Sequence, residues 1–213
     1  MHSLANAAWV LPQLSTVSAS VSQHLQQLGL KWRSTEQVRE DFKGYLVHNS
    51  SGELLATGAG KLYSDSHLEI WSTVTHTLVL SHETDNSSSA TLVWLADNRY
   101  LTGSNDSLIR LWNQGRCEAV LTGHRDWVRS MAISRGEERL LSGGMNGEIR
   151  LWDVGTLRGI DEMAVSGNAP MNSIQSTTFT ANGTGCLAVT REGVLCGYDL
   201  LSHQVLFPSV ISI

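Results

Sequence analysis

The sequence predicts an all-β fold: an incomplete β-propeller of about four four-stranded blades, with a short N-terminal helix. The main observation is an internal repeat, since residues 99–112 (RYLTGSNDSLIRLW) align without a gap with residues 139–152 (RLLSGGMNGEIRLW), 40 positions later. A fixed period of roughly 40–45 residues is typical of propeller blades. The composition agrees, because 19 glycines against 3 prolines, with 41% hydrophobic residues, suit many tight turns between short buried strands.

The short helix is expected over about residues 20–28, within an N-terminal segment of residues 1–41. Ser20 and Gln23 stand in a pattern that resembles a capping box, and Gly29 can end the helix. Its apolar stripe either packs on the blades or seats a partner. The stripe consists of Val21, Leu25 and Leu28.

From residue 42 onward, short apolar segments alternate with polar turns and form four sets of four expected strands. The propeller segment is expected over residues 42–213, with repeats at about 42–80, 90–121, 126–164 and 172–207. The third strand of the first three repeats ends in tryptophan, at Trp71, Trp112 and Trp152. The fourth repeat is degenerate, because Tyr198 takes the place of the tryptophan.

The segment that opens the third repeat carries the most specific motif. Residues 121–128 (LTGHRDWV) combine a Gly-His pair, an Asp and a Val that opens a strand, and residues 149–153 (IRLWD) close the same repeat. This pattern resembles the WD-repeat (WD40) family over about residues 42–207. The resemblance implies a propeller that binds other proteins or peptides.

The resemblance also implies a buried hydrogen-bonded chain inside each blade. In that family a His before the first strand, a Ser or Thr on the second, an Asp in the next tight turn and the Trp of the third are joined. Asn146 stands for the Asp in the third repeat; it can accept a hydrogen bond but lacks the charge. In the fourth repeat Ala188 and Glu192 fall at the Ser/Thr and Asp places, so that chain is expected to be missing. The implied structural residues are Thr57, Asp65 and Trp71; His82, Thr102, Asp106 and Trp112; and His124, Ser142, Asn146 and Trp152.

The recurring His, Ser and Asp do not predict an enzyme. A nucleophilic serine needs a reachable pocket and oxyanion donors, and an enzyme has little use for several diluted copies of one site. The histidines and cysteines have no metal-ligand spacing, and Cys117, Cys186 and Cys196 are expected to be buried, reduced thiols. We therefore expect no catalytic residue, no metal site and no cofactor.

Charge and hydropathy argue against two classes of partner, nucleic acids and membranes. The formal net charge is −5, and acidic residues dilute the Arg-rich stretch 99–158, so direct nucleic-acid binding has no electrostatic support. No run approaches the ~20 apolar residues of a membrane span. The apolar start is short and lacks a preceding basic residue, so no secretory signal is expected. We expect an intracellular protein, cytoplasmic or nuclear, without a membrane partner.

Partner binding is expected at one end of the propeller, where loops before the innermost strands meet the turns between second and third strands. Trp127 and Tyr63 are the best anchors, because aromatic side chains dominate interface energies. Two alternatives stay open: Trp127 tucks between blades, and Asp126 only holds its loop by bonding backbone amides. The candidate rim residues are Tyr63, Asn105, Arg125, Asp126, Trp127, Arg129 and Met145.

These observations favour a non-catalytic scaffold or adaptor protein. One alternative is a substrate receptor of a cullin-type ubiquitin ligase, but the Arg that such receptors often carry two residues after Trp-Asp is missing, since Val154 and Gly155 follow Asp153. The other alternative is a platform subunit of an RNA-processing or ribosome-building particle. A seven-bladed ring needs more repeats than these four. We therefore expect either a shortened product of a longer propeller or half of an assembly that another chain completes.

Overall fold

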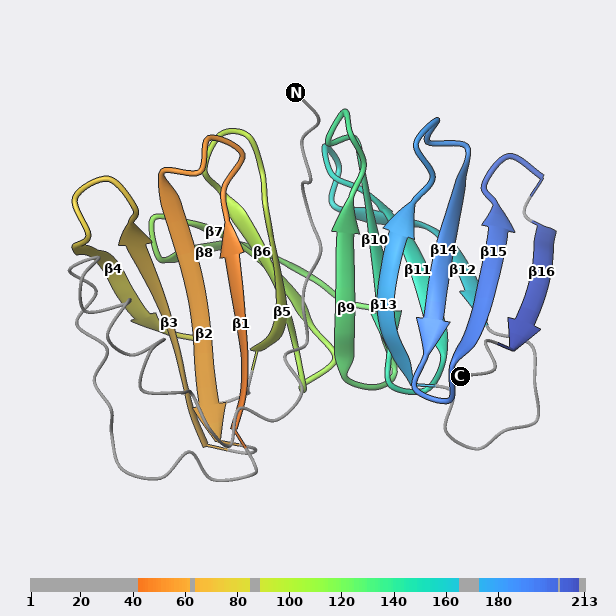
Figure 1. The fold of residues 1–213 in the computed structure, drawn as a ribbon, viewed down its shortest axis with the longest axis horizontal. Helices are drawn as coiled ribbons and strands as arrows, with labels where there is room; N and C mark the ends of the chain where they lie inside the picture. The colour runs from red at the N-terminus through yellow and green to blue at the C-terminus, as the bar shows by residue number, and fades with distance from the viewer. Residues whose placement is uncertain (1–41, 62–63, 85–88, 165–172, 203, 211–213) are drawn as a thin grey trace, which may run out of the picture. The chain divides into compact units, whose positions relative to one another are not determined.

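The computed structural model describes residues 42–61, 64–84, 89–164, 173–202 and 204–210 (Figure 1). In these residues the regular elements are all β-strands, arranged as four antiparallel sheets of four strands each. The prediction of an all-β fold with four four-stranded blades is thereby confirmed. The helix expected over 20–28 lies outside the described residues.

The chain divides into two compact units, Met1–Ser88 and Ser89–Ile213. The first unit contributes one blade, in which neighbouring strands pair in chain order. Asn49 shapes the predicted turn after the first strand, because its Oδ1 accepts a hydrogen bond from the Leu54 N–H at 3.1 Å. This first blade consists of β1 (Phe42–His48), β2 (Leu54–Lys61), β3 (Ser64–Ser72) and β4 (Leu78–Glu83).

The second unit contains three blades, each again with its strands in chain order. The second blade consists of β5 (Ser89–Trp94), β6 (Tyr100–Ser104), β7 (Ile109–Asn113) and β8 (Arg116–Leu121). The third consists of β9 (Val128–Ile133), β10 (Arg139–Gly144), β11 (Glu148–Asp153) and β12 (Arg158–Ala164). The fourth consists of β13 (Ile174–Phe179), β14 (Gly185–Thr190), β15 (Val194–Asp199) and β16 (Gln204–Val210).

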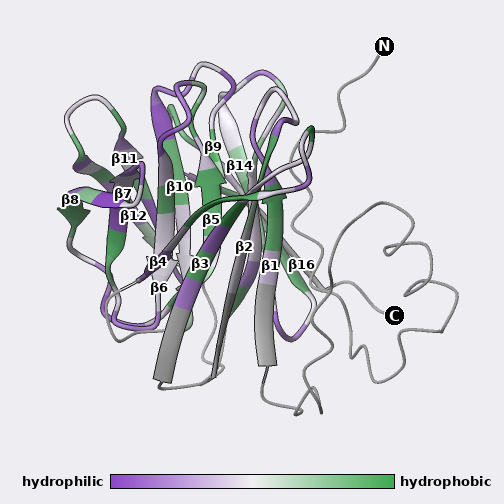
Figure 2. Ribbon diagram, turned by 90° about the vertical axis from the view of Figure 1, so that its left-hand side faces the viewer, coloured by the Kyte–Doolittle hydropathy of each residue, from purple (hydrophilic) through white to green (hydrophobic). Residues whose placement is uncertain are grey.

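Burial falls from the inner to the outer strands of a blade. Every residue of β6 is buried, whereas most of β8 and β12 is exposed. In Figure 2 hydrophobic residues run along the strands, and hydrophilic residues are prominent in the turns that join them. The inner strands are covered on both faces, so their apolar residues form continuous runs rather than an alternating pattern.

The three blades of the second unit share two hydrophobic clusters. Leu140 belongs to the cluster with blade two and its neighbour Leu141 to the cluster with blade four, because successive side chains of β10 point to opposite faces. Further members of the first cluster are Val93, Leu101, Ile109, Leu111 and Val128. Further members of the second are Ile149, Leu151, Ile174, Cys186 and Ala188.

Two glycines allow the blades of this unit to approach closely. A Cβ at Gly103 would lie 2.6 Å from Cγ1 of Val128, and one at Gly143 would lie 2.3 Å from Cγ2 of Ile174. In both cases the neighbour belongs to the first strand of the next blade. The repeated glycine therefore has a packing role, and the 40-residue period extends to the contacts between blades.

Candidate functional site

One end of the second unit, called here the rim, carries the turns that join the second and third strands of each blade and the loop 122–127 before β9. The backbone N–H of Met145 donates to the carbonyl oxygen of Trp127 at 2.8 Å, which ties the turn of blade three to this loop. The rim turns are residues 105–107, 145–147 and 191–193.

The rim turns are locally fixed. Their third residues, Ser107, Gly147 and Gly193, have φ angles of 66°, 84° and 78°. In blade two the Asp106 Oδ1 accepts from the Leu108 N–H at 3.1 Å, and in blade three the Asn146 Oδ1 accepts from the Glu148 N–H at 3.2 Å. Asx turns of this kind hold side chains at the rim on a rigid backbone.

The third blade joins His124, Ser142 and Trp152 in one buried hydrogen-bonded chain. The Trp152 Nε1–H donates to the Ser142 Oγ at 2.8 Å, and the His124 Nε2 lies 2.6 Å from the same oxygen. We assign the imidazole proton to Nδ1, because this nitrogen faces the Glu148 carboxylate at 3.7 Å, and Nε2 then accepts from the serine hydroxyl.

The residue that faces His124 Nδ1 differs from the one expected. Asn146 does not accept a hydrogen bond from this nitrogen, which has no hydrogen-bond partner among the described residues. The amide of Asn146 bonds Glu148 instead, and Glu148 Oε2 lies 3.7 Å from His124 Nδ1. Burial lowers the pKa of His124 to about 4; Glu148 opposes this shift, and the charge of Arg150 adds to it. His124 is therefore neutral near pH 7.

The second blade has a shorter version of the chain. The Trp112 Nε1–H donates to the buried Thr102 Oγ1 at 2.8 Å. Asp106 accepts from the Arg110 Nη2 at 2.7 Å, besides its bond to the backbone. His82, the histidine expected for this chain, lies in the first unit, where its Nδ1 is 3.1 Å from the Glu83 carbonyl oxygen.

The first blade departs from the expected pattern at two residues. The Trp71 Nε1–H donates to the Glu69 Oε2 at 3.0 Å and not to Thr57. Glu69 is the direct cross-strand partner of Thr57, in the place that Arg110 takes opposite Thr102, and its carboxylate is a stronger acceptor than a hydroxyl. Asp65 lies within β3 (Ser64–Ser72) rather than in a tight turn.

The fourth blade has no polar chain of this kind. Tyr198 is buried beside Cys186 and Cys196, and its hydroxyl has no hydrogen-bond partner among the described residues. Ala188 lies at the place of Ser142 and has no hydroxyl to offer. Burial raises the pKa of Tyr198, and it raises the pKa of the Cys186 thiol to about 12, so this thiol is unreactive near neutral pH. The expectation of buried cysteines is wrong for Cys117, which is exposed on the outer strand β8.

On the outer part of the rim, charges neutralise each other in a ladder of Arg125, Glu162, Arg150 and Glu148. Arg125 is 71% exposed, and its Nη2 lies 3.2 Å from the Glu162 Oε1. Glu162 also accepts from the Arg150 Nη2 at 2.8 Å, and the Arg150 Nε bonds Glu148. This ladder holds the loop before β9 against β11 and β12.

On the inner part of the rim lie Trp127, Arg129 and Met145, all half-buried. The Arg129 Cζ lies 6.0 Å from the centroid of the Trp127 ring. Asp126 accepts a hydrogen bond from the Trp127 N–H at 2.7 Å and so holds its own loop. The half-buried Asn105 has an amide oxygen without a hydrogen-bond partner among the described residues, and Tyr63 lies outside them.

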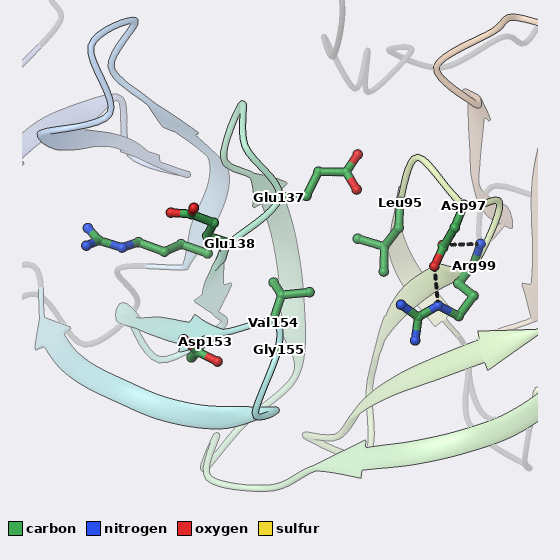
Figure 3. Close-up of a pocket in the computed structure, with 9 residues that line it drawn as sticks. Leu95, Asp97, Arg99, Glu137, Glu138, Asp153, Val154 and Gly155 are labelled. Carbon is green, nitrogen blue, oxygen red and sulfur yellow. Dashed lines mark hydrogen bonds and ion pairs between the residues drawn. The ribbon is translucent and has the colours of Figure 1, made fainter.

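At the opposite end of the same unit, a pocket of about 480 Å³ lies between the hairpins of blades two and three (Figure 3). Two of its carboxylates are already bonded within the protein: Asp97 to Arg99 at 2.7 Å, and Glu137 to the Ala96 N–H at 2.9 Å. Asp153 accepts from the Thr156 N–H at 2.6 Å. These groups hold turns, and the sequence pointed to none of them.

The described part of the chain contains no group of three His, Cys, Asp or Glu side chains placed to bind a metal ion. Among the same residues, no helix is long and apolar enough to cross a membrane.

Sequence reasoning missed Glu148, Glu162 and Arg191 as rim residues. One signal was present, because Glu148 takes the place of Leu108 when the two repeats are aligned. A charged residue where the other repeat has leucine indicates a local polar partner. For Glu162 and Arg191 the sequence offers no such contrast, since both stand in segments of ordinary surface composition.

Known proteins resemble this chain over its repeats. Residues 75–113 and 115–153 match the family described as WD domain, G-beta repeat. THO complex subunit 6 homolog of Danio rerio is 26% identical over 167 residues, covering 73% of this chain and 47% of the relative. Nuclear distribution protein nudF 2 of Penicillium rubens is 46% identical over 54 residues, 25% of this chain and 12% of that protein.

The chain thus spans about half the length of the first of these relatives and a smaller part of the second. The two matched segments contain the tryptophans that close the second and third blades, and each tryptophan bonds the Ser or Thr of its own blade. Repeat pattern, four-stranded blades and relatives agree: residues 75–113 and 115–153 are two WD repeats, and over its blades the chain resembles WD-repeat proteins.

Proposed function

We propose that this chain is a non-catalytic scaffold or adaptor that binds partner proteins or peptides at its rim. The observation that supports this proposal is that some polar side chains at the rim of the second unit are bonded inside a blade, while others remain exposed. His124, Ser142 and Trp152 are used inside blade three, while Arg125, Trp127, Arg129 and Met145 retain exposed surface on a fixed backbone.

The geometry of the His-Ser pair supports a non-catalytic role. Ser142 is fully buried, and its oxygen already accepts the indole N–H of Trp152. The low pKa of His124 makes it a weak base near pH 7. A substrate could reach neither side chain without opening the blade.

A second candidate function is that of a platform subunit within a stable multi-protein complex. A specific observation favours it, because the relative that aligns over 73% of this chain is named as a subunit of the THO complex. This candidate contains the RNA-processing or ribosome-building alternative, and it fits a place in the cytoplasm or the nucleus. No such observation favours a ubiquitin-ligase receptor.

Affinity purification of the tagged full chain, followed by mass spectrometry, tests the proposal. We expect a reproducible set of co-purified proteins that Trp127→Ala depletes and Glu138→Ala retains. Glu138 is a matched control, because it is exposed at the opposite end of the same unit. Met145→Ala is a second rim variant that removes less contact area, and thermal melting verifies that each variant is folded.

Three results would overturn the proposal: no specific partner, a set unaffected by both rim variants, or turnover of a substrate by the purified chain. The identity of the recovered proteins separates the two candidates. Recovery of the subunits of one particle would support the platform function. Recovery of cullin-ligase components would contradict both candidates and support the substrate-receptor function.

A further inference from the structure

We infer that the inner rim, formed by Trp127, Arg129 and Arg191, binds an acidic peptide segment of a partner protein through Asp or Glu carboxylates. This inference rests on the proposed function and names the chemistry of the partner. It is carried by Arg129 and Arg191, which come to the rim from neighbouring blades and have no ion pair in the described part of the chain.

A β-bulge positions the first arginine. In β9 the pairing with β10 shifts between Val128 and Ser130, which leaves Arg129 as the extra, unpaired residue. Bulges re-aim a side chain, and here Val128 packs on Gly103 of blade two while Ser130 bonds Thr177 of blade four at 2.9 Å. Arg129 takes part in neither contact.

The neighbouring blades have the same bulge but no charge on it. Ladder shifts at the same place leave Ala90 unpaired in β5 and Gln175 unpaired in β13. Arg129 is therefore a feature of blade three and not a requirement of the blade. Arg110 and Arg150, in contrast, stand at equivalent positions of the second and third repeats.

The second arginine comes from the next blade. Arg191 is exposed in the turn between β14 and β15, and its backbone N–H is fixed by the Ser173 carbonyl oxygen at 2.8 Å. Burial lowers the pKa of Arg129, and the like charge of Arg191 lowers it further. A bound carboxylate would offset these like charges.

The other arginines of the rim are neutralised within the protein. Arg110 bonds Asp106, Arg125 bonds Glu162, and Arg150 bonds both Glu148 and Glu162. In the described part of the chain, Arg129 and Arg191 have no ion pair. Forked guanidinium groups match carboxylates in geometry as well as in charge, so a pair of acidic side chains suits this place.

The surroundings favour a short acidic peptide over a nucleic-acid strand. Trp127 and Met145 border the two arginines and offer contact area to an apolar residue beside the acidic ones. Glu148 and Glu162 lie on the outer rim, and Asp126 precedes Trp127 in the loop before β9. The chain also has a net charge of −5, so a phosphate backbone would meet repulsion beyond the two arginines.

Binding of a fluorescent glutamate-rich peptide with a single leucine to the full chain tests the inference by anisotropy. The matched probe has glutamine in place of glutamate, and a single-stranded RNA oligomer is the competitor. We expect Arg129→Gln and Arg191→Gln each to lower the affinity for the acidic peptide about tenfold or more, because each variant removes one charge-assisted contact. Arg125→Gln should leave affinity within about twofold, because Arg125 is already paired.

Equal binding of the glutamine peptide, or an equal loss in the Arg125→Gln variant, would overturn the inference. Displacement by RNA at a lower concentration than by the unlabelled acidic peptide would make this surface a nucleic-acid site instead. The proposed function fails separately: partners that Trp127→Ala depletes but Arg129→Gln and Arg191→Gln retain would preserve the scaffold and remove only the acidic ligand.

Discussion

Ser142 is the residue on which the polar chain of blade three depends, because its single hydroxyl joins both His124 and Trp152. Replacing Ser142 by alanine would leave a buried indole N–H and a buried imidazole nitrogen without partners. We expect a loss of about 1–3 kcal/mol in the free energy of unfolding, measured by urea denaturation and tryptophan fluorescence.

Blade two provides the control for this prediction. Among the described residues, the Thr102 hydroxyl bonds the indole of Trp112 alone, at the position that corresponds to Ser142. Thr102→Ser retains this hydroxyl, so the variant should lose less stability than Ser142→Ala. A Ser142→Ala protein as stable as the wild type would show that the chain contributes nothing to the fold.

His124 makes the stability of the protein pH-dependent. Its pKa is about 4 in the folded state because the ring is buried, while the unfolded value is about 6.5. Between these values the unfolded state binds the additional proton, so stability falls as the pH is lowered from about 6.5 to about 4. The stabilising contribution is fully present above pH ~6.5 and lost below pH ~4; its full size is on the order of 3 kcal/mol.

Comparing the wild type with His124→Gln at several pH values measures this effect. The stability difference between the two proteins should shrink as the pH falls from 7 to 5. Hydrogen bonds from Arg150 and Asn146 outweigh burial and lower the pKa of Glu148, so its own contribution is lost only at lower pH. A stability difference that does not change over this range would contradict the assignment of a neutral, buried imidazole.

At the residue scale, the sequence predicted which positions meet but not every bond between them. In the structure Thr102 and Ser142, which the alignment of the repeats singles out, accept the indole N–H of Trp112 and of Trp152. The alignment could not show that Glu69 accepts the indole N–H of Trp71, or that Glu148 lies nearest to His124. A long carboxylate side chain can reach hydrogen-bond donors beyond the residue that pairs with it across the strands.

At the element scale, the rim turns differ in whether their third residue is a glycine, the residue that adopts a positive φ most readily. Ser107 and Gly147 occupy equivalent positions, and both have a positive φ. A non-glycine residue in this region is strained, so Ser107→Gly should stabilise the protein by about 0.5–1 kcal/mol and Gly147→Ser should destabilise it by a similar amount. Thermal melting of both variants tests the prediction, and shifts of the same sign would refute it.

Packing between neighbouring blades of the second unit depends on glycine in the second strand. A Cβ at Gly143 would fall 2.3 Å from Ile174, so Gly143→Ala must displace β13 or β10. We expect a loss of about 1–3 kcal/mol in chemical denaturation. The control is Gly136→Ala in the β9–β10 turn, where the nearest atom would be 3.8 Å away. Equal stability of the two variants would contradict the close contact.

The strands themselves were largely predictable, because short apolar runs between polar turns are a strong signal. β9 (Val128–Ile133) has the limits expected from its sequence. The beginning of β3 was not predictable: the Asp65 region reads as a turn by analogy with Asp106, whereas pairing with β2 carries the strand back to Ser64. Cross-strand pairing is a non-local interaction that one segment alone does not reveal.

At the scale of the whole molecule, residues that recur in several blades maintain the blade structure, and we propose that residues found in one blade only contact partners. Residues shared by the blades, such as Gly103 and Gly143, serve packing. Residues that occur in one blade only, such as Arg129 and Trp127, lie at the rim and have no equivalent in the other repeats. We therefore expect partner contacts to concentrate at this end of the second unit.

Amide hydrogen exchange of the full chain, alone and in the complex recovered by affinity purification, tests this central claim most directly. Added protection should concentrate in the loop 122–127, the start of β9 and the turns 145–147 and 191–193. Exchange in the exposed outer strands β8 and β12 should not change. Protection confined to these outer strands, with the rim unaffected, would contradict the account.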